Sequence, residues 1–526
     1  MVPATHFESL ILPEAQRSAF LEEIRAQVRP EYYQRIQAMT DAIPQLLRLL
    51  EHEDMSLTRL RQVVFGARTE KTDTVCPPTQ PTSSPPPKSK PKGHGRNGAR
   101  VYIGAVRVPV AHRSLKPGDL CPGCKKGKLH RQPKPAVAIR ITAQPPISAV
   151  IHEMETLRCN LCGKTYTAST PPEAGLEKYD PKVGVLLSLL RYGSGMPFYR
   201  LERLQRSLGV PLAASTQWEL VEAVAQVAQP VFDHLIFLAA QSPNLYNDDT
   251  TMQVGELRRQ IKAEVEPKRT GIFTTGIVAS AQDHAIALFF TGRRHAGENL
   301  DEVLRHRQVE LAPPLQMCDG LARNEPKEFT TIVGNCLVHA RRAFVEVTPH
   351  FPEECRRALE SLREVYRLEA RTKAERLSPE QRLQFHQTHS GPVMDQLHTW
   401  LKGQIGEKKV EPNSGLGQAI GYMLGHWEPL TLFLRKSGAP LDNNVTERTL
   451  KMAILHRKNS LSYKTQRGAQ VGDLFMSLIH TCRLGTVNPF DYLNALVRNA
   501  ARVRAHPAQW LPWNFHEARV TEGNTS

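Results

Sequence analysis

The chain has little of what marks a membrane or exported protein. No uninterrupted apolar run reaches the roughly 18 residues that a membrane-spanning helix needs, and the N-terminus lacks the apolar segment of a signal peptide. Acidic residues are also in short supply, since 52 Asp and Glu stand against 68 Lys and Arg, which gives a net charge of +16. We therefore expect a cytoplasmic protein with no membrane segment, whose basic excess favours a polyanionic partner such as nucleic acid.

Cysteines are few, nine in all, and unevenly spaced. Four of them form two Cys-x-x-Cys pairs, each followed closely by glycine: Cys121 with Cys124, and Cys159 with Cys162. Four thiolates in two such pairs suit one tetrahedral Zn²⁺, although their separation exceeds the commonest zinc-ribbon spacing and a redox pair is the alternative. The matching glycines favour a structural zinc in a small β-module. We expect packing roles for the others, which are Cys76, Cys318, Cys336, Cys355 and Cys482.

The length of the chain, 526 residues, predicts three or four domains rather than one core. A stretch rich in Pro, Ser and Gly, "PPTQPTSSPPPKSKPKGHGRNGAR", is typical of an unpacked basic linker. The predicted organisation is a helical N-terminal region (1–72), the basic linker (73–100), a zinc-binding module (101–175), a helical region with a helix-turn-helix (176–236), a catalytic core in two parts (237–345 and 437–490) around a helical insertion (346–436), and a C-terminal helical segment (491–526).

Residues 197–228 have the outline of a helix-turn-helix. Gly209 is placed to end the first helix, and Ser215 or Thr216 can cap the second. A plain helical hairpin gives the same outline, and the arginines on the first helix favour the DNA-reading interpretation only slightly. The candidate DNA-binding residues of this region are Arg203, Arg206, Ser215 and Thr216.

The run "NLYNDDTTMQV" (244–254) predicts a strand that carries two adjacent acids. If side chains alternate, Asp248 shares the largely apolar, inward face with Met252 and Val254, and Asp249 lies on the other. A carboxylate on such a face needs a cation, a hydrogen-bond network or a metal. The alternative is that Asp248 ends the strand and caps a turn.

Two further acids follow at the ends of predicted elements. Asp319 stands where an apolar run ends at Gly320, and Glu447 falls in the first turn of a helix that Asn443 or Asn444 caps. An ordinary surface pair of Glu447 with Lys451 is the alternative. One acid in a first strand, one after a later strand and one on a helix beyond an insertion is the arrangement of a ribonuclease H-like core. Two Mg²⁺ ions roughly 3.5–4 Å apart need such carboxylates. The predicted fold class is multidomain α+β with a mixed-sheet core.

Ordered blocks along nearly the whole chain give a specific resemblance. They include "LRQVVFGARTEK" (60–71), "PFYRLERLQRSLGVPLAASTQ" (197–217), "NDDT" (247–250), "CDGLARN" (318–324), "CLVHARRAF" (336–344) and "LDNNVTERTLKMAILHRKNSLSYKTQRGA" (441–469). With them the chain resembles the transposases of the bacterial insertion-sequence family numbered sixty-six. The resemblance implies a DDE transposase with Asp248, Asp319 and Glu447 as its triad, preceded by a zinc-binding domain and a helix-turn-helix. Where the family commonly has Asp-Glu-Thr, this chain has Asp249 in the place of the Glu.

We accordingly expect Mg²⁺-dependent cleavage and transfer of DNA strands at element ends. Double-stranded DNA would be the partner, bound by a homo-oligomer, with helper proteins of the same element as further partners. Basic residues just beyond the third acid would neutralise phosphates, unless they are only a solvated face; they are Arg457, Lys458, Lys464 and Arg467. An inactive DNA-binding relative is the alternative function. An RNA-directed ribonuclease H-like enzyme is disfavoured by the helix-turn-helix outline.

Overall fold

The computed structural model describes two compact units of the chain. The units are residues 1–79 with 348–360, and residues 80–347 with 361–526. The described residues are 21–25, 27–30, 32–34, 36–37, 72–75, 107–131, 136–138, 141, 145–158, 160, 162, 164–175, 177–264, 269–281 and 284–520. Cys159, Cys76 and nearly all of the predicted linker lie outside them.

The first unit is helical wherever its described residues form regular structure. Helical stretches occur at 21–25 and 32–34, and α3 (Thr72–Val75) extends into the start of the predicted linker. Helix α10 (Pro352–Ala374) begins in this unit and continues into the second.

The second unit holds all of the strands that the described residues form. Its first half contains β1 (Thr156–Arg158), β2 (Thr165–Thr167), η3 (Pro172–Ala174), α4 (Pro181–Ser188), η4 (Leu189–Gly193), α5 (Phe198–Ser207), α6 (Ala214–Ala240), β3 (Asn244–Thr251), α7 (Gly255–Ala263), β4 (Phe273–Ala281), β5 (His284–Gly292), α8 (Ala296–Leu304), β6 (Leu315–Cys318), η5 (Ala322–Asn324) and β7 (Ile332–Asn335). Its second half contains α9 (Leu337–Val347), α11 (Pro379–Gly406), α12 (Gly415–Gly425), α13 (Trp427–Leu430), η6 (Leu432–Leu434), α14 (Asn444–Ser460), α15 (Gln466–Leu484), α16 (Pro489–Arg498), α17 (Ala500–Ala505), η7 (Pro507–Trp510) and α18 (Phe515–Val520).

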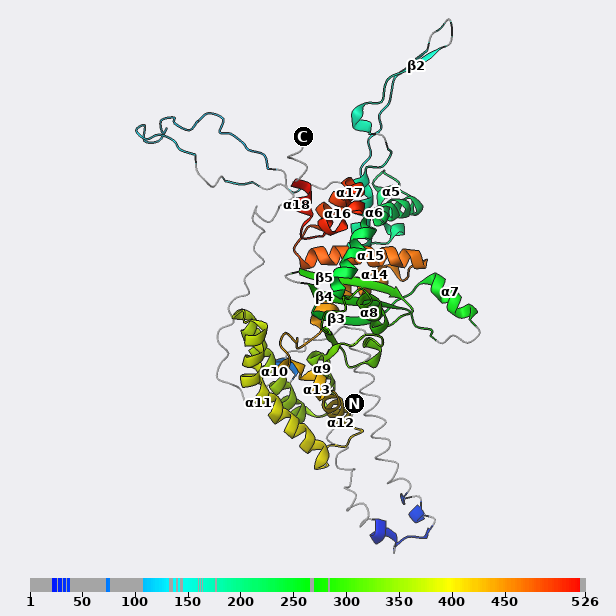
Figure 1. The fold of residues 1–526 in the computed structure, drawn as a ribbon, viewed down its shortest axis with the longest axis vertical. Helices are drawn as coiled ribbons and strands as arrows, with labels where there is room; N and C mark the ends of the chain where they lie inside the picture. The colour runs from blue at the N-terminus through cyan, green and yellow to red at the C-terminus, as the bar shows by residue number, and fades with distance from the viewer. Residues whose placement is uncertain are drawn as a thin grey trace. The chain divides into compact units, whose positions relative to one another are not determined.

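A five-stranded mixed sheet lies at the centre of this unit, in the order β5-β4-β3-β6-β7 (Figure 1). Strands β3, β4 and β5 pair antiparallel, whereas β6 and β7 run parallel to β3. The strand predicted over 244–254 is confirmed as β3, which ends at Thr251. Strand β7 ends at Asn335, and α9 begins two residues later at Leu337.

Helices cover both faces of the sheet. On one face, Asn299 of α8 donates to Thr275 of β4 at 2.8 Å. On the other, α14 packs so closely that a Cβ on Gly276 of β4 would lie 3.0 Å from Leu450. The prediction that β3 has a single inward face is therefore wrong, since Leu245 and Asn247 on the α8 side are fully buried. The alternating side chains of β3 point to two faces of the sheet, and helices cover both.

The edge of the sheet at β5 is closed by a helix instead of another strand. Three side chains of α15, spaced one turn apart, accept the backbone N–H groups of β5. Thr481 accepts from Ala287, Ser477 from Phe289 and Asp473 from Thr291. Unpaired strand edges are sites of aggregation. Here the α15 side chains bond the N–H groups that would otherwise be unpaired along the outer edge of β5.

Helix α6 is the central helix of the hydrophobic core. By length and composition it could cross a membrane, but residues along its whole length are buried against α4, α15 and β4. One side of α6 is therefore part of the hydrophobic core, while residues such as Glu219 and Asp233 are exposed. Proline at position 230 lies inside it.

The stretch predicted as a helical insertion contains α10 to α13. Helix α12 returns to pack on α9 and contacts α11. Its Tyr422 and His426 lie so near Gly320 that a Cβ there would approach both to 2.8 Å. The helices between the second and third acids thus support the turn that carries Asp319.

Candidate active site

The first two predicted acids lie on neighbouring parallel strands. Residues 244 to 246 of β3 pair with residues 315 to 317 of β6. Continuing this register by two residues sets Asp248 beside Asp319, which directly follows β6. Parallel neighbours are about 4.8 Å apart, so the sheet brings the two carboxylates together on the face that α14 covers.

Glu447 reaches the same place from α14. Asn443 is the N-cap of that helix, as predicted, although its side chain makes no capping bond and donates instead to the Asn247 carbonyl at 3.0 Å. This bond ties the start of α14 to β3. Gly276 pairs with Asp248 in the sheet, and its missing side chain lets Leu450, one turn after Glu447, approach the strand.

The pKa of Asp248 is affected by the other two acids. Burial raises the pKa of Asp248 to about 7, and the negative charges of Asp319, Asp249 and Glu447 add to this, against one hydrogen bond from the Asp249 amide. Among the described residues, no lysine, arginine or histidine forms an ion pair with Asp248. A carboxylate among carboxylates is a site that lacks positive charge.

Asp249 is treated differently on the opposite face of β3. Its carboxylate accepts from His295 Nδ1 at 2.9 Å and lies 3.6 Å from the Arg323 guanidinium, and its side chain is only 2% exposed. His295 caps α8, and Arg323 lies in η5 just after Asp319. Asp249 is therefore paired with side chains of two neighbouring segments and links strand β3 to the Asp319 turn.

The Asp319 side chain is oriented by its own turn. Its Oδ1 accepts from Asn324 Nδ2 at 2.5 Å and from the Leu321 amide at 3.2 Å. A short acidic side chain that bonds amides two residues ahead stabilises a turn of this kind. Both bonds fall on one oxygen, so they fix the carboxylate without using its other oxygen.

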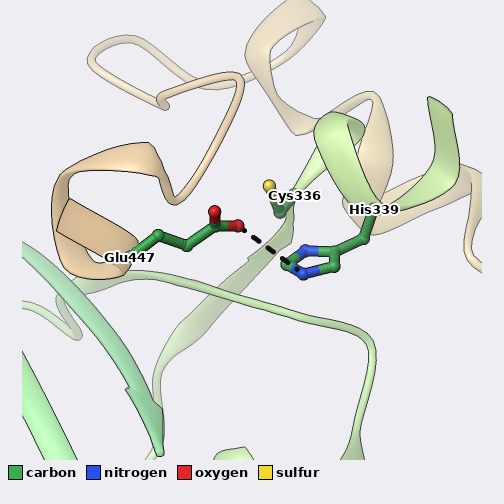
Figure 2. Close-up of side chains that lie close together, drawn as sticks. All are labelled: Cys336, His339 and Glu447. Atoms are coloured by element: carbon green, nitrogen blue, oxygen red, sulfur yellow. Dashed lines mark ion pairs between the residues drawn. The ribbon is translucent and has the colours of Figure 1, made fainter. Parts of the chain in front are cut away.

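Two residues that were not predicted as site residues also contact this site. His339, in the first turn of α9, has its Nε2 at 3.6 Å from Glu447 Oε1, and the Sγ of Cys336 belongs to the same cluster (Figure 2). The expected burial of Cys336 is confirmed, but packing alone does not describe its surroundings. The signal was the Cys-x-x-His spacing in "CLVHARRAF", which places both residues at one end of a helix.

The predicted basic residues beyond Glu447 divide into two groups. Arg457 donates to Thr250 at 3.3 Å and to Thr251 at the end of β3, and Arg467 pairs with Glu222 at 3.0 Å. These two arginines hold protein groups. Lys458 and Lys464 are exposed and pair with no described residue, so they are the ones available to an outside anion.

The helix, turn, helix order at 197–228 is present, with one correction. Gly209 ends α5 with a positive φ of 79°, as predicted. Neither Ser215 nor Thr216 caps α6, because the helix starts at Ala214 and the Glu202 carboxylate accepts its first amide at 3.3 Å. Ser215 is exposed and Thr216 half-buried in the first turn. Arg203 is exposed without a described ion-pair partner, while Arg206 pairs with Glu202 at 2.7 Å.

The first cysteine pair lies in a tight hairpin turn. Lys125 donates its amide to the Cys121 carbonyl at 2.8 Å, and the Gly127 amide donates to Cys124 Sγ at 3.4 Å. Amides of Gly127 and Lys126 lower the pKa of the Cys124 thiol. Cys162 is exposed, and strands β1 and β2 flank the second pair. Of the strands predicted between the pairs, the described residues form only β1.

Comparison with known proteins decides the family. Residues 179–471, more than half of the chain, match the sequence model described as "Transposase IS66 family". The chain belongs to the IS66 transposase family. Membership implies DNA transposition, and with it DNA binding, phosphoryl transfer on DNA and divalent metal ions.

Relatives in Sinorhizobium fredii (strain NBRC 101917 / NGR234) extend this match. "Uncharacterized protein y4jD" is 24% identical over 517 residues, which cover 91% of this IS66-family chain and 97% of that protein. "Uncharacterized protein y4hP" is 26% identical over 346 residues, or 62% of this chain and 61% of that protein. "Uncharacterized protein y4qI" is 23% identical over 349 residues, with the same coverage of 62% and 61%.

Proposed function

We propose that this chain is the DDE transposase of an insertion sequence, with Asp248, Asp319 and Glu447 as its catalytic carboxylates. The observation that carries the proposal is the contrast at β3: Asp248 lies among acids without a paired cation, whereas Asp249 is paired with His295 and Arg323. Nothing in folding alone favours the gathering of three acids from three separate elements.

The sheet supports a ribonuclease H-like reading of this core. The first three strands of the sheet, β3, β4 and β5, pair antiparallel, and β3 also pairs parallel with β6. Asp248 lies on β3, and Asp319 directly follows β6. The third acid follows on α14, after the helices α10 to α13. This is the order that the DDE arrangement requires.

The acid cluster fits the divalent ions that the family implies. Asp248, Asp319 and Glu447 offer hard oxygen ligands of the type that Mg²⁺ takes, and among the described residues no cation is paired with Asp248. Burial, with the charges of Asp319, Asp249 and Glu447 beside it, raises the pKa of Asp248. When bound, two Mg²⁺ ions would supply nucleophile activation and stabilisation of the leaving oxygen.

The protein's own groups would orient this reaction. Asn324 and the Leu321 amide hold the Asp319 carboxylate, and Asn443 ties the helix of Glu447 to the strand of Asp248. Lys458 and Lys464, exposed beyond the third acid, would receive DNA phosphates, with non-specific affinity that falls as salt rises.

DNA recognition and the zinc module belong to the same proposal. Arg203 and the start of α6, with Ser215 and Thr216, would contact the element ends. Cys121, Cys124, Cys159 and Cys162 would bind one structural Zn²⁺, for which the amide-to-sulfur bond at Cys124 is the supporting geometry. Cys121→Ser should then lower the zinc content by about one ion per chain. Equal zinc contents in wild type and Cys121→Ser would contradict the proposed zinc module.

Cleavage of DNA that carries the element ends tests the central claim. The full-length chain should nick such DNA with Mg²⁺ or Mn²⁺ and stay inactive in EDTA. The matched substrate has the same length and a scrambled end sequence. Binding of the correct end without nicking in either metal would identify the chain as an inactive DNA-binding relative.

A further inference from the structure

Three potential metal ligands of different chemistry meet at the first turns of α9 and α14. Cys336 lies between β7 and α9, His339 is in the first turn of α9, and Glu447 is in the first turn of α14 (Figure 2). One ligand atom from each lies within 4.8 Å of the other two. At 3.6 Å, the His339 Nε2 to Glu447 Oε1 contact is longer than a hydrogen bond.

Two atoms of this cluster are buried without a partner. Glu447 Oε1 and His339 Nδ1 make no hydrogen bond within the described part of the chain. A buried polar atom that is left without a hydrogen bond destabilises the fold. One ion can bind only one nitrogen of the His339 ring, and Nε2 is the nitrogen that lies beside Glu447. The unpaired Glu447 Oε1 is therefore the atom that indicates a missing cation.

The thiol of Cys336 accepts a hydrogen bond from a backbone amide. The Asn443 amide donates to Cys336 Sγ at 3.2 Å. Burial raises the pKa of this thiol to about 11, while the amides of Asn443, His339 and Val338 oppose the rise. Amides that point at a buried sulfur stabilise a thiolate when a metal displaces its proton, and such outer contacts strengthen metal sites.

We propose that Cys336, His339 and Glu447 bind a zinc-class divalent ion at a site that shares Glu447 with the Asp248–Asp319 cluster. Thiolate and imidazole ligands favour Zn²⁺ over Mg²⁺. Binding releases the Cys336 proton to solvent, and three protein ligands leave a fourth position open. A further consequence, which rests on the proposed function, is that zinc draws Glu447 away from the magnesium set and inhibits cleavage.

Zinc content tests the site without reference to cleavage. Full-length protein loaded with Zn²⁺ and freed of excess should hold about one ion more per chain than Cys336→Ser. His339→Gln, at a half-buried position, should show the same loss if Cys336→Ser fails to fold. The control Cys482→Ser changes another buried thiol, on α15, and should keep all of its zinc. Equal contents in every protein that folds would overturn the site.

Cobalt gives the ligand identity. Co²⁺-loaded wild type should show more thiolate-to-cobalt absorption than Co²⁺-loaded Cys336→Ser, whereas His339→Gln should lose tetrahedral bands. Identical spectra for wild type and Cys336→Ser would contradict a thiolate ligand.

Inhibition of DNA cleavage by Zn²⁺ tests the zinc site separately from the proposed transposase function. At fixed Mg²⁺, the Zn²⁺ concentration that halves cleavage should rise about 10–100-fold in His339→Gln. A chain that binds this zinc but never cleaves DNA supports the site and removes the proposed function. If the chain cleaves DNA but wild type and variants have equal zinc contents, the proposed function is supported and the zinc site is overturned.

Discussion

The two faces of strand β3 hold adjacent aspartates in opposite electrostatic settings. Asp248 faces α14, where its neighbours are the acids Asp319 and Glu447. Asp249 faces α8, where His295 and Arg323 lie within 4 Å of its carboxylate. One residue type, at consecutive positions of one strand, is thus a site without countercharge on one face and a paired structural acid on the other.

The difference shows that burial alone does not identify a metal ligand. The Asp249 side chain is 2% exposed, yet it is already paired with His295 and Arg323, and a cation there would compete with both. Asp248, by contrast, forms no ion pair with a cation among the described residues. The partners of a buried acid separate a structural role from a chemical one.

The largest expected effect is that of Asp248→Asn on cleavage. The substitution keeps size and hydrogen bonding but removes the charge that would hold Mg²⁺, so strand cleavage should fall by several orders of magnitude. Asp319→Asn and Glu447→Gln should behave alike, as measured on an oligonucleotide with one element end in Mg²⁺ and in Mn²⁺. Asp249→Asn is the matched control and should retain most of the activity. If the control loses cleavage and Asp248→Asn keeps it, the roles of the two faces are exchanged.

Stability should change in the opposite sense. In EDTA, Asp248→Asn should raise the unfolding temperature because it relieves repulsion among the acids. Asp249→Asn should lower stability by about 1–3 kcal/mol, since it leaves His295 and Arg323 without their partner. Thermal unfolding of both variants beside wild type measures this. Equal shifts in one direction would show that the two faces do not differ as described.

The sequence identified the acids but not the partners that distinguish them. Alternation predicted that Asp248 and Asp249 point to opposite faces, and the caps and apolar runs located Asp319 and Glu447. The strand pattern could not show that α8 also covers the Asp249 face, because His295 and Arg323 reach it from 46 and 74 positions away. The Glu202 carboxylate that replaces the expected cap on α6 is likewise a tertiary contact, and local capping rules cannot reveal it.

Asp473 is a further buried acid, and it lies away from both faces of β3, on α15. Burial raises its pKa to about 7, opposed by hydrogen bonds from the Thr291 amide and hydroxyl. Because the folded-state pKa lies above the ordinary 3.8, its contribution to stability is complete below about pH 4 and is lost as pH rises through 7, by up to roughly 1.4 kcal/mol per pH unit.

Asp473→Asn should flatten this part of the pH dependence and make the protein more stable than wild type at pH 8. Chemical denaturation at pH 5 and pH 8 measures the slope, with the exposed Asp395→Asn as control. Mg²⁺ should leave the Asp473 contribution unchanged but alter that of Asp248. An unchanged slope in Asp473→Asn would mean that this acid is ionised in the folded protein at both pH values.

The smallest expected effect concerns DNA binding, which the proposal places away from β3. Arg203 is exposed and pairs with no described residue, whereas Arg206 is already bound to Glu202 at 2.7 Å. Arg203→Ala should therefore weaken binding to an element end by more than Arg206→Ala. If Arg203 contacts one phosphate, its loss should reduce the slope of log affinity against log salt by about 0.9.

Fluorescence anisotropy over a series of salt concentrations measures both quantities. The control is Arg498→Ala, an exposed arginine on α16, which should match wild type. Asp248→Asn should also bind like wild type, because the loss of one acid removes no contact to phosphate. If Arg203→Ala and Arg498→Ala bind equally at every salt concentration, α5 and α6 form a plain helical hairpin. Recognition of the element ends must then lie elsewhere in the chain.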